Sequence, residues 1–237
     1  MYLSFKKQND FKSYFLKGFQ VKSANIFNIN KKKKLIILDY YSGLSGSDLI
    51  LNGDVETHKI LNIFLSKYTK NLIDTSRIVK FDKKPYLMKC NEIKKKITPK
   101  YIYLYKKIFK KIYSSLDSIK INFKGGCHGD LTLSNIIINK EFKKIILIDF
   151  LKTFNETPLQ DICKLIQDLR LYWSSRRLHN SDLLRAKIFC DNLDPFSVIK
   201  KDLLLYKIVD LEMCMTLLRI LPYVSESDFQ TITWIEN

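Results

Sequence analysis

A short polar segment followed by two β-branched runs constrains the fold of this chain more than any other feature. The segment has the sequence HGDLTLSN and covers residues 128–135. Two apolar runs follow it, at 136–138 and 145–148, and polar residues join them, a pattern that predicts a β-hairpin. Asn135 then stands just before the first strand and Asp149 at the end of the second. We therefore expect Asp130, Asn135 and Asp149 to face one cleft.

Two carboxylates and one amide at this spacing suit phosphoryl transfer from Mg-ATP to a hydroxyl group. Such a transfer needs an aligned hydroxyl and a base that accepts its proton. Asp130 is the candidate catalytic base. Asn135 and Asp149 are candidate Mg²⁺ ligands, because magnesium combines one or two carboxylates with phosphate oxygens and water. His128 is the candidate for orienting the loop through hydrogen bonds. The alternative is an Asn/Asp turn that only precedes a hairpin.

Residues from His128 to about Trp173 resemble the aminoglycoside phosphotransferase and choline kinase group of the protein-kinase-like superfamily. The segment 128–135 matches the family's catalytic loop, and Ile148-Asp149-Phe150 matches its metal-binding strand end. The sequence PLQD at 158–161 matches the start of a helix whose Asp braces the catalytic loop. The resemblance thus implies structural support by Asp161, with ATP and Mg²⁺ as cofactors. Gly129 and Leu151 differ from the eukaryotic protein kinase pattern and favour small-molecule kinases.

The same resemblance implies an α+β fold of two lobes, with a reduced N-terminal β-lobe and a large, mainly helical C-lobe. Residues 1–41 would form the residual N-lobe, and residues 42–237 would form the C-lobe with the catalytic hairpin. The residue pattern predicts a helix over 8–18 ended by Gly18, and strands over 24–29 and 35–41 joined by a polar turn at 30–34.

The turn-rich segment 41–47 is the predicted hinge between the lobes. Asp39, Tyr40 and Tyr41 are the candidates for presenting backbone groups to the adenine ring, although they also suit a plain strand end. Beyond the hinge, helical periodicity predicts a helix from Asp54 or Val55 to about Tyr68 and another from Pro99 to about Leu116. Four more helices are expected, with starts near Pro158, Ser181, Ser197 and Ser225.

The first forty or so residues depart from the family pattern. They contain no glycine-rich loop, the first glutamate of the chain is Glu56, and the phosphate-binding strand lysine has no counterpart. A truncated or split gene product, a divergent minimal kinase and a catalytically weak relative all explain this departure. The last of these would be a nucleotide- or partner-binding module, which is our alternative to an active enzyme.

The composition of the chain limits which metal sites, disulfides and membrane segments it can contain. The chain has 237 residues, a net charge of +17, five dispersed cysteines without a CxxC pair, and three histidines. These counts argue against a zinc site or a complete disulfide framework and favour free, buried thiols. We find no signal peptide and no apolar run of membrane-spanning length. We therefore expect a cytoplasmic protein without a transmembrane segment, and peripheral contact with a membrane surface stays open.

The function that we predict is transfer of a phosphoryl group to the hydroxyl of a small molecule. The basic residues in the C-terminal part of the chain, such as Arg176, Arg177 and Arg219, favour a neutral or anionic acceptor over a polycation. Residues 217–223 resemble segments of bacterial relatives associated with surface polysaccharide synthesis and favour a sugar or another glycan precursor. Tyr172, Trp173 and Tyr206 could instead cage a quaternary ammonium group, or simply pack helices. No motif supports nucleic-acid binding, and the oligomeric state is open.

Overall fold

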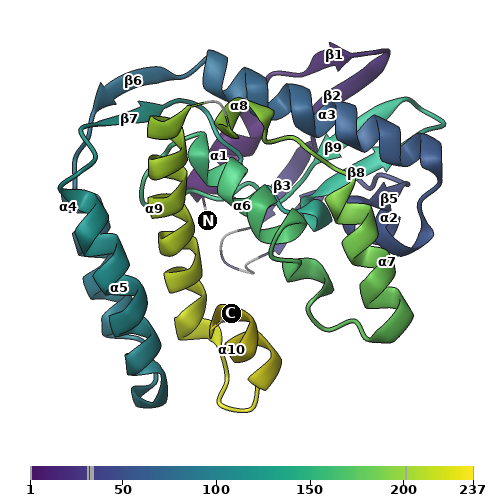
Figure 1. Cartoon of the computed structure of the whole chain (residues 1–237). Helices are drawn as coiled ribbons and strands as arrows, with labels where there is room; N and C mark the ends of the chain where they lie inside the picture. The colour runs from purple at the N-terminus through teal and green to yellow at the C-terminus, as the bar shows by residue number, and fades with distance from the viewer. Residues whose placement is uncertain (1, 31, 33–34, 201, 237) are drawn as a thin grey trace.

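The computed structural model describes residues 2–30, 32, 35–200 and 202–236 (Figure 1). The first part of the chain contains α1 (Tyr2–Asn9), β1 (Tyr14–Leu16), β2 (Phe19–Ser23), β3 (Ile26–Asn30), β4 (Leu35–Leu38), β5 (Leu44–Ser45), α2 (Gly46–Asn52), α3 (Val55–Asp74), β6 (Arg77–Lys80), α4 (Lys84–Lys94), the 3₁₀ turn η1 (Pro99–Tyr101) and α5 (Ile102–Leu116). The second part contains β7 (Ile121–Lys124), η2 (Leu133–Asn135), β8 (Ile136–Asn139), β9 (Lys144–Leu147), α6 (Leu159–Leu169), η3 (Trp173–Ser175), α7 (Asn180–Asp191), α8 (Ser197–Lys200), α9 (Leu203–Ile220), η4 (Leu221–Tyr223) and α10 (Phe229–Glu236).

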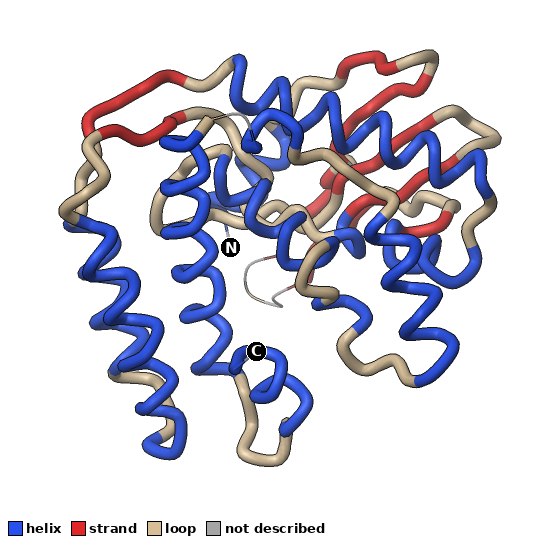
Figure 2. Tube along the Cα trace, viewed as in Figure 1, coloured by secondary structure: helices blue, strands red, loops and turns tan. Residues whose placement is uncertain are grey.

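The predicted catalytic hairpin is present as β8 and β9, at the centre of a five-stranded sheet. The strand order is β1-β2-β9-β8-β5, with β2 parallel to β9 and the other neighbours antiparallel (Figure 2). Ile136 pairs with Leu147 and Asn139 with Lys144, so the register places Asn135 and Ile148 side by side at one end. Ile136, Ile145 and Leu147 are almost fully buried, because β-branched and apolar side chains pack well on a pleated surface.

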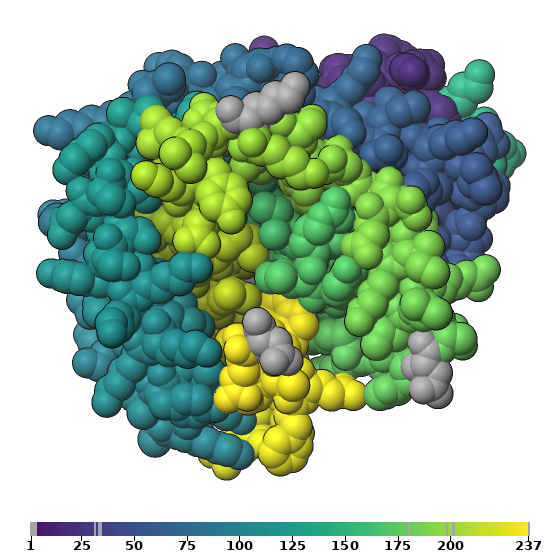
Figure 3. Space-filling view, in the orientation of Figure 1, coloured from purple at the N-terminus to yellow at the C-terminus, as the bar shows by residue number. Residues whose placement is uncertain are grey.

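Helices surround this sheet and complete one continuous hydrophobic core. The helix α9 lies between α5 and α6 and packs against both (Figure 1). Asp54 is the N-cap residue of α3, and its side chain accepts a hydrogen bond from the Thr57 N–H at 2.7 Å. The C-terminal residues lie at the surface between α5 and the segment around α7, as the space-filling view shows (Figure 3).

Most of the predicted helices are confirmed. The helix α3 extends six residues beyond Tyr68, to Asp74, and Pro99 opens η1, which leads into α5. The helices α6 and α7 begin close to Pro158 and Ser181. The start near Ser197 gives only the short α8, and the long helix α9 begins at Leu203. The last helix, α10, begins at Phe229 rather than near Ser225.

The predicted helix over 8–18 is wrong. The helix α1 ends at Asn9, and residues 14–23 form the antiparallel hairpin of β1 and β2. Lys17 and Gly18, with φ angles of 46° and 84°, are the two central residues of the hairpin turn. Such a turn needs positive φ at both positions, whereas the sequence pattern had predicted that Gly18 ends a helix. A glycine with positive φ serves both purposes, so its presence alone does not distinguish them.

The predicted strands over 24–29 and 35–41 correspond to β3 and β4, which pair antiparallel in a sheet of their own. Residues 31, 33 and 34 of the predicted turn lie outside the described residues. The mixture of helices with small sheets agrees with the predicted α+β class. The division into lobes at residues 1–41 and 42–237 stays a proposal. Because β2 pairs with β9, the central sheet contains strands from both sides of that boundary.

All five cysteines are free and buried. Among the described residues, no helix combines the length and the apolar character that a bilayer crossing requires.

Candidate active site

The helix α6 holds the loop 128–135 in place through two buried carboxylates. Asp161 accepts hydrogen bonds from the backbone N–H groups of His128 and Gly129, both at 2.6 Å, and from the Tyr68 hydroxyl at 3.2 Å. Two helical turns further on, Asp168 accepts from the Leu133 N–H at 2.6 Å. Burial raises the pKa of Asp161 to about 6, and the two N–H groups act against this rise by favouring the carboxylate.

Gly129 is the residue that lets the loop pass close to the segment following Asp149. Its φ is +90°, and a Cβ atom at this position would lie 2.0 Å from the backbone oxygen of Leu151. The Leu151 N–H in turn donates to the His128 carbonyl at 2.9 Å. Only glycine fits this conformation and this spacing, which explains the glycine between His128 and Asp130.

His128 connects the loop to the end of β9. The side chain is fully buried, its Nε2 is 2.7 Å from the Ile148 carbonyl oxygen, and its Nδ1 is 3.3 Å from the Asp130 nitrogen. These partners assign a neutral ring that donates through Nε2 and accepts at Nδ1. Burial lowers the pKa of His128 to about 4, which agrees with that assignment. The ring also packs against Phe150, with 4.1 Å between the centroids.

Asp130, Asn135 and Asp149 line the same cavity, which has a volume of about 320 Å³ and which we call the catalytic cavity. Asn135 donates through Nδ2 to the Asp130 backbone oxygen at 2.7 Å, so its Oδ1 is the atom left to coordinate a cation. Asp149 has a φ of 57°, an uncommon backbone conformation for a residue other than glycine. Such conformations concentrate at functional sites, where the surrounding structure enforces them.

Lys164 of α6 lies opposite the loop and forms an ion pair with Asp130, with 2.9 Å between Nζ and Oδ1. Gln167 and Ser174 line the same wall. No sequence motif pointed to Lys164, Gln167 or Asp168 as site residues. The sequence does contain a pattern that indicates their role, because Asp161, Lys164 and Asp168 follow one another at spacings of three and four and so share one face of a helix. Polar side chains on one face of a largely buried helix require partners.

The three hinge candidates are not among the residues that line the catalytic cavity. Asp39 accepts hydrogen bonds from the Asn25 side chain at 2.5 Å and from the Tyr41 hydroxyl at 2.6 Å. The Tyr40 side chain is 91% exposed. Adenine binding by this segment stays a prediction.

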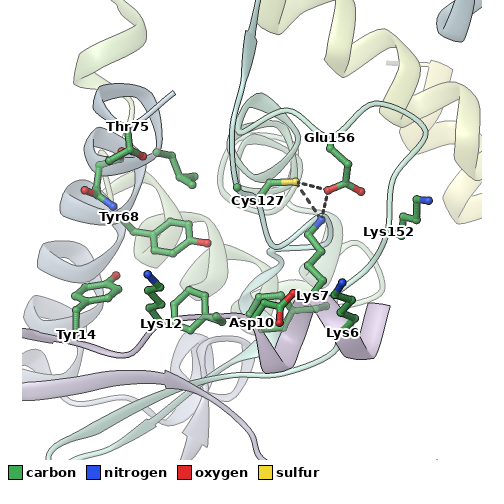
Figure 4. A pocket seen from close by; sticks show the side chains of 15 residues that line it. Lys6, Lys7, Asp10, Lys12, Tyr14, Tyr68, Thr75, Cys127, Lys152 and Glu156 are labelled. Carbon is green, nitrogen blue, oxygen red and sulfur yellow. Dashed lines mark hydrogen bonds and ion pairs between the residues drawn. The ribbon is translucent and has the colours of Figure 1, made fainter. Parts of the chain in front are cut away.

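A half-buried lysine, Lys7, joins α1 to both flanks of the catalytic loop (Figure 4). Lys7 Nζ lies 2.6 Å from Glu156 Oε2, 3.0 Å from the Leu151 backbone oxygen and 3.2 Å from Cys127 Sγ. Burial raises the pKa of the Cys127 thiol, so the counter-ion of Lys7 is Glu156. Lys7, Cys127 and Glu156 border a second cavity of about 540 Å³ between α1 and α3, against Phe150. No local sequence pattern predicts the pair of Lys7 and Glu156, because it joins segments about 150 residues apart.

The donor set of the catalytic cavity fits a magnesium–nucleotide complex. Within the described part of the chain, no three His, Cys, Asp or Glu side chains gather into a site that could hold a metal alone. Magnesium does not need such a cage, because phosphate oxygens and water complete its octahedral shell. The Asp149 carboxylate and the Asn135 amide oxygen would be the two protein ligands in such an arrangement.

The position of these groups agrees with a kinase-like class of protein. The model of the ecdysteroid kinase-like family matches residues 54–173. This match covers half of the chain, from α3 through the catalytic loop and the hairpin to η3, and the chain belongs to this family. The narrower resemblance to the aminoglycoside phosphotransferase and choline kinase group is not confirmed. Neither the curated proteins nor the solved structures gave a match. Family membership supports a kinase-like small-molecule phosphotransferase and names no acceptor or cofactor for this chain.

Proposed function

We propose that the protein is a kinase that transfers the γ-phosphoryl group of Mg-ATP to a hydroxyl group of a small molecule. The observation that carries the proposal is the convergence of Asp130, Asn135 and Asp149 on one cavity, in a chain of a kinase-like family. Phosphoryl transfer depends mainly on positioning and on stabilising charge, and this cavity offers groups for both.

Asp130 is the proposed base that accepts the proton of the acceptor hydroxyl. Lys164 contacts its Oδ1 at 2.9 Å, which leaves the second carboxylate oxygen to receive that proton. Asn135 and Asp149 would hold Mg²⁺, and Mg-ATP supplies the phosphoryl group together with the cation that neutralises its charge. His128, Gly129 and Asp161 are positioning residues, because they fix the loop without lining the catalytic cavity.

The narrower acceptor that we propose is a sugar or another precursor of a surface glycan, which rests on the resemblance of residues 217–223. The family's name suggests an ecdysteroid as a further acceptor to test. The cytoplasm, where ATP is available, is the proposed location.

The direct test is acceptor-dependent ADP formation by the purified protein with Mg-ATP. The panel contains sugars, choline, ethanolamine and an ecdysteroid. Asp130→Asn and Asp149→Asn should lower turnover by at least about 100-fold, the usual contribution of a catalytic base or an essential metal ligand. The matched control is Asp182→Asn, at an exposed position of α7. Equal turnover by the wild type and both site variants would refute the proposal.

A module that binds a nucleotide or a protein partner without turnover is the second candidate. It is favoured by the absence of a glycine-rich loop before residue 41 and by hinge candidates that lie outside the catalytic cavity. A thermal-shift titration separates binding from catalysis, because a ligand that binds only the folded state raises the melting temperature. Stabilisation by Mg-ATP without product formation on the whole panel would favour this candidate.

A further inference from the structure

A basic cavity adjoins the catalytic cavity on the side of Asp130. It has a volume of about 630 Å³ and shares Asp130, Lys164, Trp173 and Ile220 with the catalytic cavity. Residues of α4, α6, η3, α9 and α10 line it, together with the segment that follows Asp149. Because Asp130 is the proposed base, a hydroxyl group that reaches it would come from a molecule bound here. We call this space the acceptor cavity.

The charges of the acceptor cavity do not balance. Its lining contains three acidic residues, and each is already paired with a lysine or arginine of the same lining. The distances are 2.9 Å for Glu92 with Lys89, for Asp228 with Arg177 and for Asp130 with Lys164. Four more cations line the cavity without a carboxylate at ion-pair distance among the described residues: Lys96, Lys152, Arg176 and Arg219.

The two arginines are half-buried and held by neutral partners. Arg176 stacks on the Trp173 ring at 3.6 Å and donates to the Trp173 carbonyl at 2.9 Å and to Thr231 Oγ1 at 3.2 Å. Arg219 donates to Gln160 Oε1 at 2.9 Å. Each guanidinium has five N–H donors, so several remain for a ligand. A fixed guanidinium suits a phosphate or a carboxylate, which it can bind through two parallel hydrogen bonds.

Burial of such cations is unfavourable unless an anion or water compensates them. Consistent with this cost, burial lowers the pKa of both guanidinium groups. The overall charge of +17 does not account for the arrangement. Exposed lysines such as Lys107 of α5, and likewise Lys96 and Lys152 of the cavity lining, are solvated and need no partner. The half-buried Arg176 and Arg219 are therefore the cations that call for an anion. A polycationic acceptor would meet four uncompensated positive charges in this cavity.

We propose that the acceptor carries an anionic group of its own, a phosphate or a carboxylate, and that Arg176 and Arg219 bind it with help from Lys96 and Lys152. This inference rests on the proposed function and narrows its acceptor class. The anion anchors the molecule in the acceptor cavity while a hydroxyl group reaches Asp130. During the transfer, the hydroxyl oxygen bonds to the γ-phosphorus, the bond from that phosphorus to ADP breaks, and the hydroxyl proton passes to Asp130.

The kinetic test compares acceptors that differ only in the anion. Suitable pairs are glucose with glucose 6-phosphate and glycerol with glycerol 3-phosphate, with glucosamine as a cationic reference. We expect kcat/KM to be at least tenfold higher for the anionic member of a pair and to fall as ionic strength rises. Arg176→Gln and Arg219→Gln should lower the anionic-to-neutral ratio at least tenfold, mainly through KM. The control Lys107→Gln should leave the ratio unchanged. An equal preference for neutral acceptors would overturn the inference.

A binding test needs no acceptor. Inorganic phosphate is titrated into the full chain, with the fluorescence of Trp173, which stacks on Arg176, as the readout. The inference is supported if Arg219→Gln and the exposed Lys96→Gln both weaken phosphate binding and Lys107→Gln does not. Lys96→Gln keeps the test valid if the loss of Arg219 impairs folding. The titration is repeated with the protein saturated by a Mg²⁺ complex of a non-hydrolysable ATP analogue. Phosphate binding that persists assigns the four cations Lys96, Lys152, Arg176 and Arg219 to the acceptor. If the analogue abolishes phosphate binding, the four cations belong to the nucleotide site and the inference is overturned.

The two proposals fail in different ways. Asp149-dependent turnover that prefers neutral acceptors would leave the proposed function intact and refute the anionic acceptor. Phosphate binding without any turnover of Mg-ATP on the panel would refute the proposed function and leave an anion-binding cavity without an acceptor role.

Discussion

The buried imidazole of His128 makes the stability of the catalytic loop depend on pH. In the folded chain the pKa of His128 is lowered by burial to about 4, from an ordinary value of 6.5. Above pH 6.5 the ring is neutral in both the folded and the unfolded states, and it contributes no pH dependence. As the pH falls below 6.5, the unfolded chain takes up a proton that the folded chain does not. The free energy of unfolding therefore falls, by about 2 kcal/mol at pH 5 and about 3 kcal/mol at pH 4.

The variant His128→Gln removes this titration and keeps an amide donor for the Ile148 carbonyl. At pH 7.5 it should be less stable than the wild type by about 1–2 kcal/mol, because the hydrogen bonds of a buried ring are imperfectly replaced. At pH 5 the difference should shrink by about 2 kcal/mol. Urea denaturation of both proteins at the two pH values measures it, and all other titrating groups are common to both. A difference that stays constant, or grows towards pH 5, would refute a neutral, buried His128.

Three further substitutions test how the loop is held. Gly129→Ala places a Cβ atom 2.0 Å from the Leu151 backbone oxygen at a φ of +90°, so it should lower the free energy of unfolding by about 3 kcal/mol or more. The control Gly126→Ala should change it little, because no heavy atom lies within 4 Å of the added Cβ. Asp161→Ala leaves two buried N–H groups without their acceptor, so we expect a loss of about 3 kcal/mol by urea denaturation together with a drop in turnover. Lys7→Met leaves the half-buried Glu156 without its counter-ion and should lower both stability and turnover, whereas the exposed Lys12→Met should change neither. Equal effects of the two lysine variants would contradict a role for the pair of Lys7 and Glu156.

The local motifs of the catalytic segment were sufficient to predict its secondary structure. The β-branched runs after Asn135 formed β8 and β9 as expected, because a short apolar run bounded by polar residues has few other ways to bury its side chains. The same pattern placed Asn135 and Asp149 at one end of the hairpin. The periodicities of α3 and α5 were equally informative, since both helices bury one face against the core.

The missed features depend on contacts between distant parts of the chain. The pairing of β2 with β9 joins residues more than one hundred positions apart, and no local pattern encodes it. Lys164 and Asp168 become part of the site only because α6 packs beneath the catalytic loop. Gly18 misled the prediction of the first helix, because positive φ is common to hairpin turns and helix ends. The charge excess of the acceptor cavity was visible in the sequence only as a surplus of arginine and lysine.

The central claim is that Asn135 and Asp149 hold one divalent cation together with the nucleotide, beside Asp130. Electron paramagnetic resonance of Mn²⁺, in place of Mg²⁺, with a non-hydrolysable ATP analogue measures this complex directly. We predict that the wild type and Asp182→Asn bind the Mn²⁺–nucleotide complex alike, and that Asn135→Leu and Asp149→Asn each weaken binding at least tenfold. Binding of equal strength in all four proteins would contradict the account.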